Sequence, residues 1–258
     1  MIASPLPYSP YRPRSTREKA SGVSATEPSL IPYVTLREGE EAAPATLAFV
    51  QEWPGNRLRL RYTDKEPEDR DVRGALWGRC SQNRRDQWNM PTGKPLWRLM
   101  HPSRQRECMQ TMRCQVCVQP AKTPLGYIFL AGPDDYTPHE STIVTAQPPM
   151  CARHVRAAAM LCPHLGGRPL VFLAESAPLY GVHGTVYGYG QGGVHAVDQP
   201  DFPLRYGDPD LPVFLASQLV RRLSVFRRLS LAELLAELTA FRAPVPHQTG
   251  SVHACPAA

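Results

Sequence analysis

The sequence predicts an α+β fold in which a β-rich body carries a treble-clef-like zinc-binding insert and ends in amphipathic C-terminal helices. Three observations lead to this prediction. Short apolar runs rich in β-branched and aromatic residues, separated by turn-forming residues, indicate strands along much of the chain. Two cysteine and histidine pairs near the middle have the spacing of zinc ligands. Near the C-terminus, leucines recur at the spacing of a helix face.

The composition indicates a folded protein built from short elements. Of 258 residues, 42% are hydrophobic and 20% are charged, which excludes wholesale disorder. The 28 prolines are about twice the average share, so long helices are expected only where proline is absent. No stretch reaches the roughly 18 apolar residues that span a bilayer, and prolines interrupt the N-terminus where a signal peptide needs an apolar run. We therefore expect a cytoplasmic protein with no membrane partner.

The chain is expected to hold one domain between two disordered ends. Residues 1–29 are rich in Pro, Ser and Arg and lack periodicity, which is typical of a disordered basic arm. Residues 243–258 predict a second disordered tail. Between them, 30–242 predict a single α+β domain whose zinc module covers about 108–166. Nothing in the sequence indicates an oligomeric state.

The N-terminal half of this domain is predicted to be mostly strands. Strand-like runs occupy 31–37, 45–51, 57–62 and 75–81, and the third of them alternates arginine with leucine or tyrosine. Residues 102–112 suit a helix with Pro102 at its first position.

The zinc motif follows this helix. Cys114-x2-Cys117 is separated by 33 residues from Cys151-x2-His154. Two strand-like runs, 125–132 and 141–147, are expected to form a hairpin between the pairs, and a helix is expected from Cys151 to Leu161. A turn with two ligands (the zinc knuckle, Cys114 to Cys117), a hairpin and a helix in this order predict a treble clef. Four nitrogen and sulfur ligands close a tetrahedral site, so Zn²⁺ is expected to be structural.

Several segments resemble a group of Streptomyces-type actinobacterial proteins. The segments are WRLMHPSRQRECM, RCQVC, PPMCARH with its CPHL sequel, and LASQLVR, and the likeness spans roughly residues 30–225. Those proteins look as if they carry Cys-x2-Cys in both halves of the zinc motif, so His154 stands where their last cysteine would be. The resemblance implies a recurring metal-bearing domain of high-GC bacteria, and it implies no activity.

Cys162-Pro163-His164 offers two further metal ligands close to the motif. In a regular helix Cys162 lies about 16 Å along the axis from Cys151, too far to share one zinc ion. Three interpretations stay open: the pair packs in the core, it replaces a ligand after the chain folds back, or it forms a second functional site.

The next region predicts strands and a glycine-rich hairpin. Residues 168–175 indicate a buried strand, and the Gly/Tyr run 180–193 indicates a hairpin with its loop. Gly188-x-Gly190-x-x-Gly193 matches the dinucleotide fingerprint in form, but no helical pattern follows it. His183 and His195 flank the loop and would form either a second metal or acid/base site or ordinary loop histidines.

Two helices are predicted at the C-terminal end. From Pro212 to Arg228, four apolar residues spaced by four, four and three would share one helix face. Ser230 and Glu233 form a capping box, with Leu229 and Leu234 placed as a hydrophobic staple, for a second helix from about Leu231 to Phe241.

These observations favour a zinc-stabilised binding or regulatory protein that contacts nucleic acid or a protein partner. The nucleic-acid candidates are four arginines of the first C-terminal helix: Arg221, Arg222, Arg227 and Arg228. The alternative is an actinobacterial biosynthetic (tailoring) enzyme with a structural zinc. Its active site would lie near Cys162 and His164, or near His183 and His195.

Overall fold

The computed structural model describes residues 31–42, 46–52, 57–133, 136, 142–162, 165 and 168–242. The predicted arm 1–29 and tail 243–258 lie outside the described residues. Within the described part, no helix has the length and apolar character needed to cross a membrane.

The fold mixes helices with many strands, as an α+β prediction requires. The α-helices are α1 (Pro102–Thr111), α2 (Val155–Leu161) and α3 (Leu231–Arg242). The strands are β1 (Thr35–Arg37), β2 (Leu47–Glu52), β3 (Arg57–Tyr62), β4 (Leu76–Trp77), β5 (Pro95–Met100), β6 (Tyr127–Ala131), β7 (Ile143–Thr145), β8 (Leu170–Ser176), β9 (Leu179–Gly190), β10 (Gly193–Asp198), β11 (Leu204–Arg205), β12 (Phe214–Leu223) and β13 (Val225–Leu229). Two 3₁₀ helices, η1 (Pro67–Asp69) and η3 (Leu211–Val213), complete the set described here.

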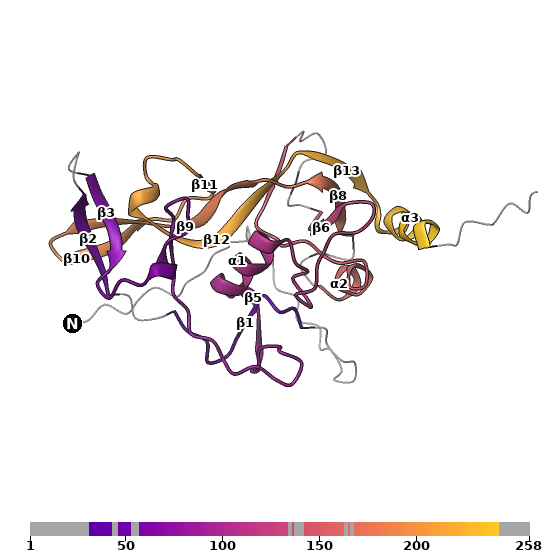
Figure 1. Cartoon of the computed structure of the whole chain (residues 1–258), viewed down its shortest axis with the longest axis horizontal. Coiled ribbons are helices and arrows are strands. Elements are labelled where there is room, and N and C mark those ends of the chain that lie inside the picture. Colours follow the sequence, from indigo (N-terminus) through magenta and orange to yellow (C-terminus); the bar gives the residue numbers. More distant parts are fainter. Residues whose placement is uncertain are drawn as a thin grey trace, which may run out of the picture.

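A long central sheet runs through an elongated molecule (Figure 1). Its strand order is β10-β9-β12-β4, with β11 paired to β9 and β7 paired to β12. Helix α1 packs on β12, where Met109 joins Phe214 and Leu219 in one apolar cluster. The strand β12 is buried over nearly its whole length, so it lies at the centre of the core.

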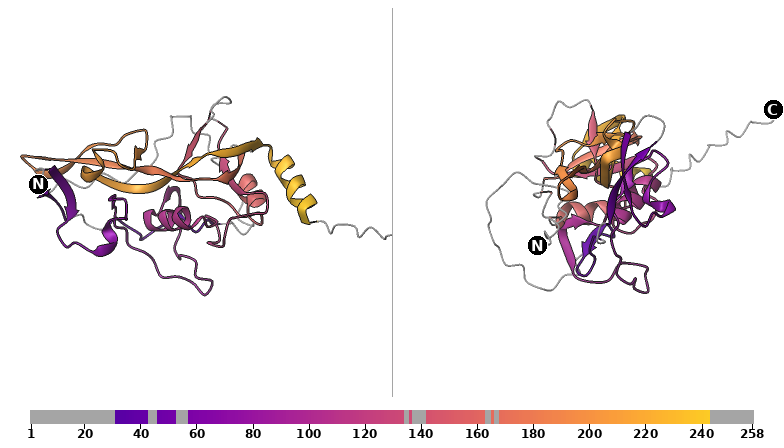
Figure 2. Two further views of the ribbon diagram at one scale, coloured as in Figure 1. Left: turned by 45° about the horizontal axis from the view of Figure 1, so that its top comes forward. Right: turned by 90° about the vertical axis from the view of Figure 1, so that its left-hand side faces the viewer.

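A second sheet and two helices form one end of the molecule. The sheet has the order β13-β8-β6, and Phe172 on β8 makes edge-to-face contacts with Phe226 and Tyr136. Helices α2 and α3 lie at this end (Figures 1 and 2). Their apolar residues Val155, Leu234 and Leu238 enter a cluster that also contains Cys114.

The β2–β3 hairpin lies at the opposite end from α3 (Figure 1). Leu60 and Tyr62 of β3 are buried against Leu76 and Leu215, whereas the arginines of β3 alternate with them toward solvent. The Arg/Leu alternation seen in the sequence therefore separates a packed face from a charged face.

The predicted helix over 212–228 is wrong. After η3, this segment forms the strands β12 and β13. Leucines spaced by four fit both a helix and a strand, because four is a multiple of the two-residue strand period. A central strand with both faces buried reads as a nearly continuous apolar run. The second predicted helix is confirmed as α3, with both capping-box bonds between Ser230 and Glu233.

The predicted hairpin between 125–132 and 141–147 is also wrong. Strand β6 pairs with β8, and β7 pairs with β12, so the two runs belong to different sheets. The three-residue β7 would offer β6 few partners, whereas β8 matches five of its residues in register. The glycine-rich run does form the predicted hairpin, as β9 and β10.

A charged pair is buried beneath α1. Arg104 contacts Glu40 through two bonds of 2.6 and 2.7 Å, and both side chains are almost fully buried. Burial alone would raise the pKa of Glu40, but hydrogen bonds from the Arg104 guanidinium and from the N–H groups of Arg37 and Asn83 outweigh it and lower that pKa. No local pattern indicates this pair, because its members are 64 positions apart.

His101 caps the start of α1 as a neutral imidazole. Its Nε2 donates to the Ser81 carbonyl at 3.0 Å, which leaves Nδ1 to accept from the Arg104 backbone N–H at 3.5 Å. The ring is fully buried, and this burial, with the nearby Arg104 charge, lowers the pKa of His101 to about 4.

Acid should therefore destabilise the fold through His101. Between pH 6.5 and about 4, His101 is protonated in the unfolded chain but stays neutral in the folded protein. Stability is fully present above this window and falls by about 3 kcal/mol through it. The pH dependence of the free energy of unfolding is measured by urea unfolding of the wild type and of His101→Asn. The variant keeps a capping side chain but does not titrate. Equal pH dependence of the two proteins from pH 7 to 5 would count against it.

Candidate metal centre

Two turns bring the four predicted ligands together. The first turn follows α1, which ends at Met112 in the left-handed conformation (φ 53°), and it carries Cys114 and Cys117. The second turn carries Cys151 and His154 and leads into α2, with His154 at the helix cap. Its N–H groups at His154 and Val155 both bond to the Cys151 carbonyl.

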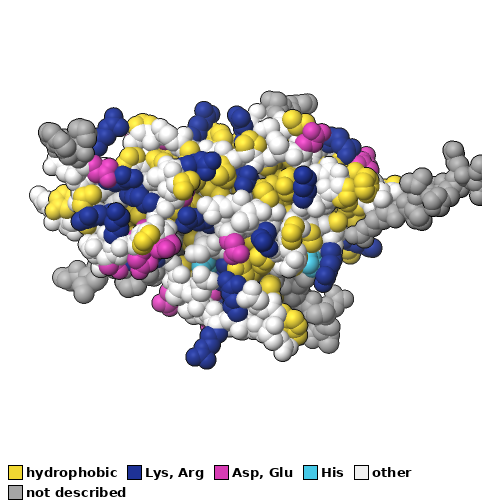
Figure 3. All heavy atoms as spheres, viewed as in Figure 1, with side chains coloured by type: hydrophobic (Ala, Val, Ile, Leu, Met, Phe, Trp, Pro, Cys, Tyr) yellow, Lys and Arg dark blue, Asp and Glu magenta, His cyan; other side chains and the backbone are white. Residues whose placement is uncertain are grey.

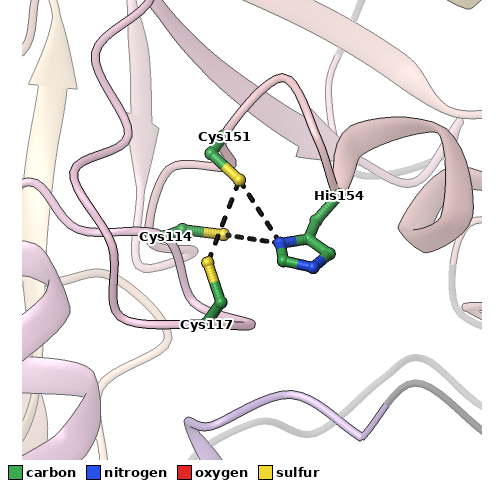
Figure 4. A group of neighbouring side chains, drawn as sticks. All are labelled: Cys114, Cys117, Cys151 and His154. Carbon is green, nitrogen blue, oxygen red and sulfur yellow. Dashed lines mark hydrogen bonds between the residues drawn. The ribbon is translucent and has the colours of Figure 1, made fainter.

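The four ligand atoms form one compact group (Figure 4). They are the sulfurs of Cys114, Cys117 and Cys151 and a nitrogen of His154, and all lie within 4.8 Å of one another. The His154 ring presents Nδ1 to the group, 3.3 Å from the Cys151 sulfur and 3.9 Å from the Cys114 sulfur. The Cys117 and Cys151 sulfurs are 3.9 Å apart. This group could hold a metal ion.

Three of the separations are close to those of a tetrahedral shell. With metal–sulfur bonds of about 2.3 Å and metal–nitrogen bonds of about 2.0 Å, tetrahedral edges are about 3.8 Å between sulfurs and about 3.5 Å between sulfur and nitrogen. The three edges given above, 3.3 to 3.9 Å, lie close to these values, and all separations in the group are within 4.8 Å. The four ligand atoms therefore lie close enough together for one ion to bind to all of them.

Backbone N–H groups in both turns are directed at the sulfurs. Cys114 accepts from Val116 and Cys117, and Cys151 accepts from His154. A hydrogen bond from the Cys151 thiol lowers the pKa of Cys114 to about 7, and the same bond, together with burial, raises the pKa of Cys151 to about 12. A divalent cation would replace the remaining thiol protons, so metal affinity should rise with pH.

The first turn holds a strained residue. Val118, directly after Cys117, has a φ of 61°, a conformation that β-branched residues rarely adopt and that costs about 1–3 kcal/mol. It is held there because its N–H donates to the Cys114 carbonyl and its own carbonyl accepts from Arg113 Nη1. Such strain is typical of segments fixed by a ligand or by their surroundings.

The first turn is also bonded to distant parts of the chain. The carbonyls of Gln115 and Val116 accept from the N–H groups of Val34 and Tyr33, and the Gln115 N–H donates to Pro149. Cys114 is fully buried, whereas the other three ligands are partly exposed. The centre thus ties the segment before β1, the end of α1 and the start of α2 to one another.

The Cys162-Pro163-His164 segment contributes no ligand to this group in the described part of the chain. Cys162 caps the end of α2 and packs, partly buried, against the apolar cluster that contains Cys114. His164 lies outside the described residues.

The two glycine-hairpin histidines are not brought together. His183 lies on β9 and His195 on β10, where it is paired with Gly188. Five residues of strand separate Gly188 from His183, which is about 17 Å. Burial lowers the pKa of His183, while His195 is exposed and contacts the Gly193 carbonyl. A joint acid/base or metal site at these two residues is therefore contradicted.

The four C-terminal arginines do not share a helix face. Arg221 is buried in β12, where its guanidinium donates to the carbonyls of Met109 and Gln110 and, through a short bond, to that of Ala177. Arg227 pairs with Glu237, Arg228 lies over the Phe172 ring, and Arg222 is exposed. The arginine helix predicted from the sequence is wrong, because the segment forms the strands β12 and β13. Arg221 also supports the core rather than facing solvent.

Comparisons with known proteins add no relative. No family model, curated protein or solved structure matches the chain.

Proposed function

We propose that this chain is a zinc-stabilised binding protein that contacts nucleic acid. Three thiolates and one imidazole favour zinc over the oxygen-preferring divalent cations, and a shell closed by four protein atoms is the structural arrangement. The compact Cys114, Cys117, Cys151 and His154 group is the observation that carries this proposal. Of the treble clef expected from the sequence, a ligand-bearing turn and a ligand-bearing helix start support the proposal, whereas β6 and β7 between them belong to different sheets.

The ion would act as a cross-link in the fold. It joins two turns that are 34 to 40 residues apart, and these turns border the apolar cluster in which α2 and α3 pack. Helix α2 has only seven residues, and isolated helices shorter than about 12 residues are marginal in water. Its stability would therefore come from the metal and from packing.

A polyanionic partner fits the charge of the chain. The net charge is +6, and 25 of the 29 basic residues are arginine, whose planar fork binds phosphate through two parallel hydrogen bonds. Nucleic acid is the partner class with a regular array of phosphates. A protein partner is the alternative outcome of the test below.

The test is the salt dependence of binding by zinc-loaded protein. Fluorescence anisotropy with labelled duplex DNA, single-stranded DNA and RNA should show binding that weakens between about 50 and 200 mM salt. If none of the three nucleic acids binds at the lower salt concentration, the nucleic-acid assignment fails, whether or not the zinc site is present.

A further inference from the structure

The outward face of the β2–β3 hairpin carries a row of three arginines. Arg57, Arg59 and Arg61 alternate along β3 with residues that pack inward, so successive arginines are about 6.7 Å apart. Dark-blue basic side chains gather over this end of the molecule (Figure 3). The hairpin is anchored by buried Leu60 and Tyr62, which makes the row a fixed array rather than a flexible tail.

Two of the three arginines have free guanidinium groups. Arg57 and Arg61 are exposed, and neither makes an ion pair or side-chain hydrogen bond with the described residues. Arg59 is bound by Glu52 through contacts of 2.7 and 2.9 Å. The pair is partly exposed, with 29% of the Arg59 side chain and 50% of the Glu52 side chain accessible. Ion pairs near the surface are weak, so a phosphate group can compete with Glu52 for Arg59.

A shallow pocket adjoins the row. Its volume is about 260 Å³, and it is lined by Arg57, Arg59 and Arg73 together with the carboxylates of Glu52 and Asp208. The three guanidinium groups exceed the two carboxylates by one charge at this point. The pocket therefore extends the positive surface beyond the strand itself.

Within the described strands β2 and β3, this face has no side chain that would stack on bases. The residues of β2 that lie opposite Arg61 and Arg59 are Ala48 and Val50, and no aromatic side chain shares this face of the two strands. Single-strand binders use aromatic platforms for unstacked bases. Phosphate contacts alone fix a duplex in position without reading its sequence.

We propose that the Arg57–Arg59–Arg61 row on β3 contacts the phosphate backbone of duplex DNA without sequence preference. This inference rests on the proposed function and locates its contact surface. The spacing of the arginines is comparable with that of successive phosphates along one strand, and each contact would release condensed counterions.

Salt-dependent binding of the zinc-loaded full chain to a short labelled duplex tests the row. Arg57→Gln/Arg61→Gln should weaken binding about 50-fold at about 0.1 M salt and reduce the slope of log K against log salt by about 2. Glu52→Gln should tighten binding, because it removes the carboxylate that occupies Arg59. The matched control is Arg84→Gln/Arg98→Gln, which removes the same charge from exposed residues in the loop before β5 and in β5. The strand β5 lies away from the β2–β3 hairpin (Figure 1).

Each contrary outcome identifies what is wrong. If the wild type binds duplex DNA but only the control variant loses affinity and slope, the surface is misplaced while the proposed function stands. Tighter binding of single strands or RNA that depends on the row would overturn the duplex assignment. Absence of binding to any nucleic acid removes both proposals. Circular dichroism and zinc content, unchanged in all variants, exclude misfolding as the cause because every substituted side chain is at the surface.

Discussion

Cys114→Ser is expected to abolish stoichiometric zinc binding and to unfold the end of the domain that carries α2 and α3. Cys114 is the fully buried ligand, and its sulfur contacts the His154 ring within the metal group. Structural zinc supplies roughly 10–16 kcal/mol to zinc-finger peptides at neutral pH, which matches or exceeds the stability of a typical domain, about 5–15 kcal/mol. The expected result is loss of the cooperative thermal transition, measured by circular dichroism, with less than one zinc per chain.

Cys162→Ser is the matched control for this prediction. It makes the same chemical change in a cysteine that packs against the same apolar cluster but does not belong to the metal group. Its zinc content should equal that of the wild type, and its stability should fall by about 1 kcal/mol at most. Equal melting and equal zinc content for Cys114→Ser and Cys162→Ser would contradict the assigned ligand.

Glu40→Gln is expected to destabilise the fold by about 3–5 kcal/mol. The substitution preserves the shape of the side chain but leaves the Arg104 guanidinium buried without its counter-charge. Arg104 also donates to the Thr35 carbonyl, so it cannot turn toward water without breaking a second bond. Urea unfolding at pH 7 measures the change as a shift of the midpoint.

Two further variants separate the burial of this pair from charge pairing in general. Glu237→Gln breaks the exposed Arg227–Glu237 pair and should leave the unfolding midpoint nearly unchanged. Replacing both partners, as Glu40→Leu/Arg104→Met, should recover part of the loss, since the unpaired Arg104 charge is then removed as well. The recovery should stay incomplete, because the buried Arg37 also loses Glu40 as its neighbouring negative charge. A Glu40→Gln variant as stable as Glu237→Gln would show that the buried pair contributes little.

The sequence predicts best where the signal is local. The Cys114/Cys117 and Cys151/His154 spacings, the Ser230–Glu233 capping box and Pro102 at the first turn of α1 each involve residues three or four apart. Local spacing determines which side chains a turn or helix start brings together. These features were predicted in their correct places, and the four ligands do meet in one group.

Features that depend on distant partners were not predictable in the same way. The spacing of leucines in the 212–228 segment fits a helix and a strand. The segment forms a strand because its residues 214–221 pair with β9 and β4. The strands β6 and β7 pair with β8 and β12, which lie far along the chain from them. The local pattern places Arg221 at the surface, whereas its buried position depends on carbonyls more than forty positions away.

The candidate DNA-contacting row shows a mixed outcome. The alternation of arginine in 57–62 was visible in the sequence and correctly indicated a strand with one polar face. The sequence directs the nucleic-acid hypothesis to the arginine-rich segment at 221–228 instead, because that segment has the pattern of an exposed helix. The structure removes Arg221 from the surface and leaves Arg57 and Arg61 of the β3 row exposed, with Arg59 partly buried between them.

X-ray absorption at the zinc edge, on purified tag-free protein, tests the metal centre most directly. We expect one zinc per chain with three sulfur neighbours at about 2.3 Å and one nitrogen at about 2.0 Å. A shell of oxygen atoms, a sulfur count that is unchanged in Cys114→Ser, or protein that is folded without stoichiometric zinc would contradict a structural ion held by Cys114, Cys117, Cys151 and His154.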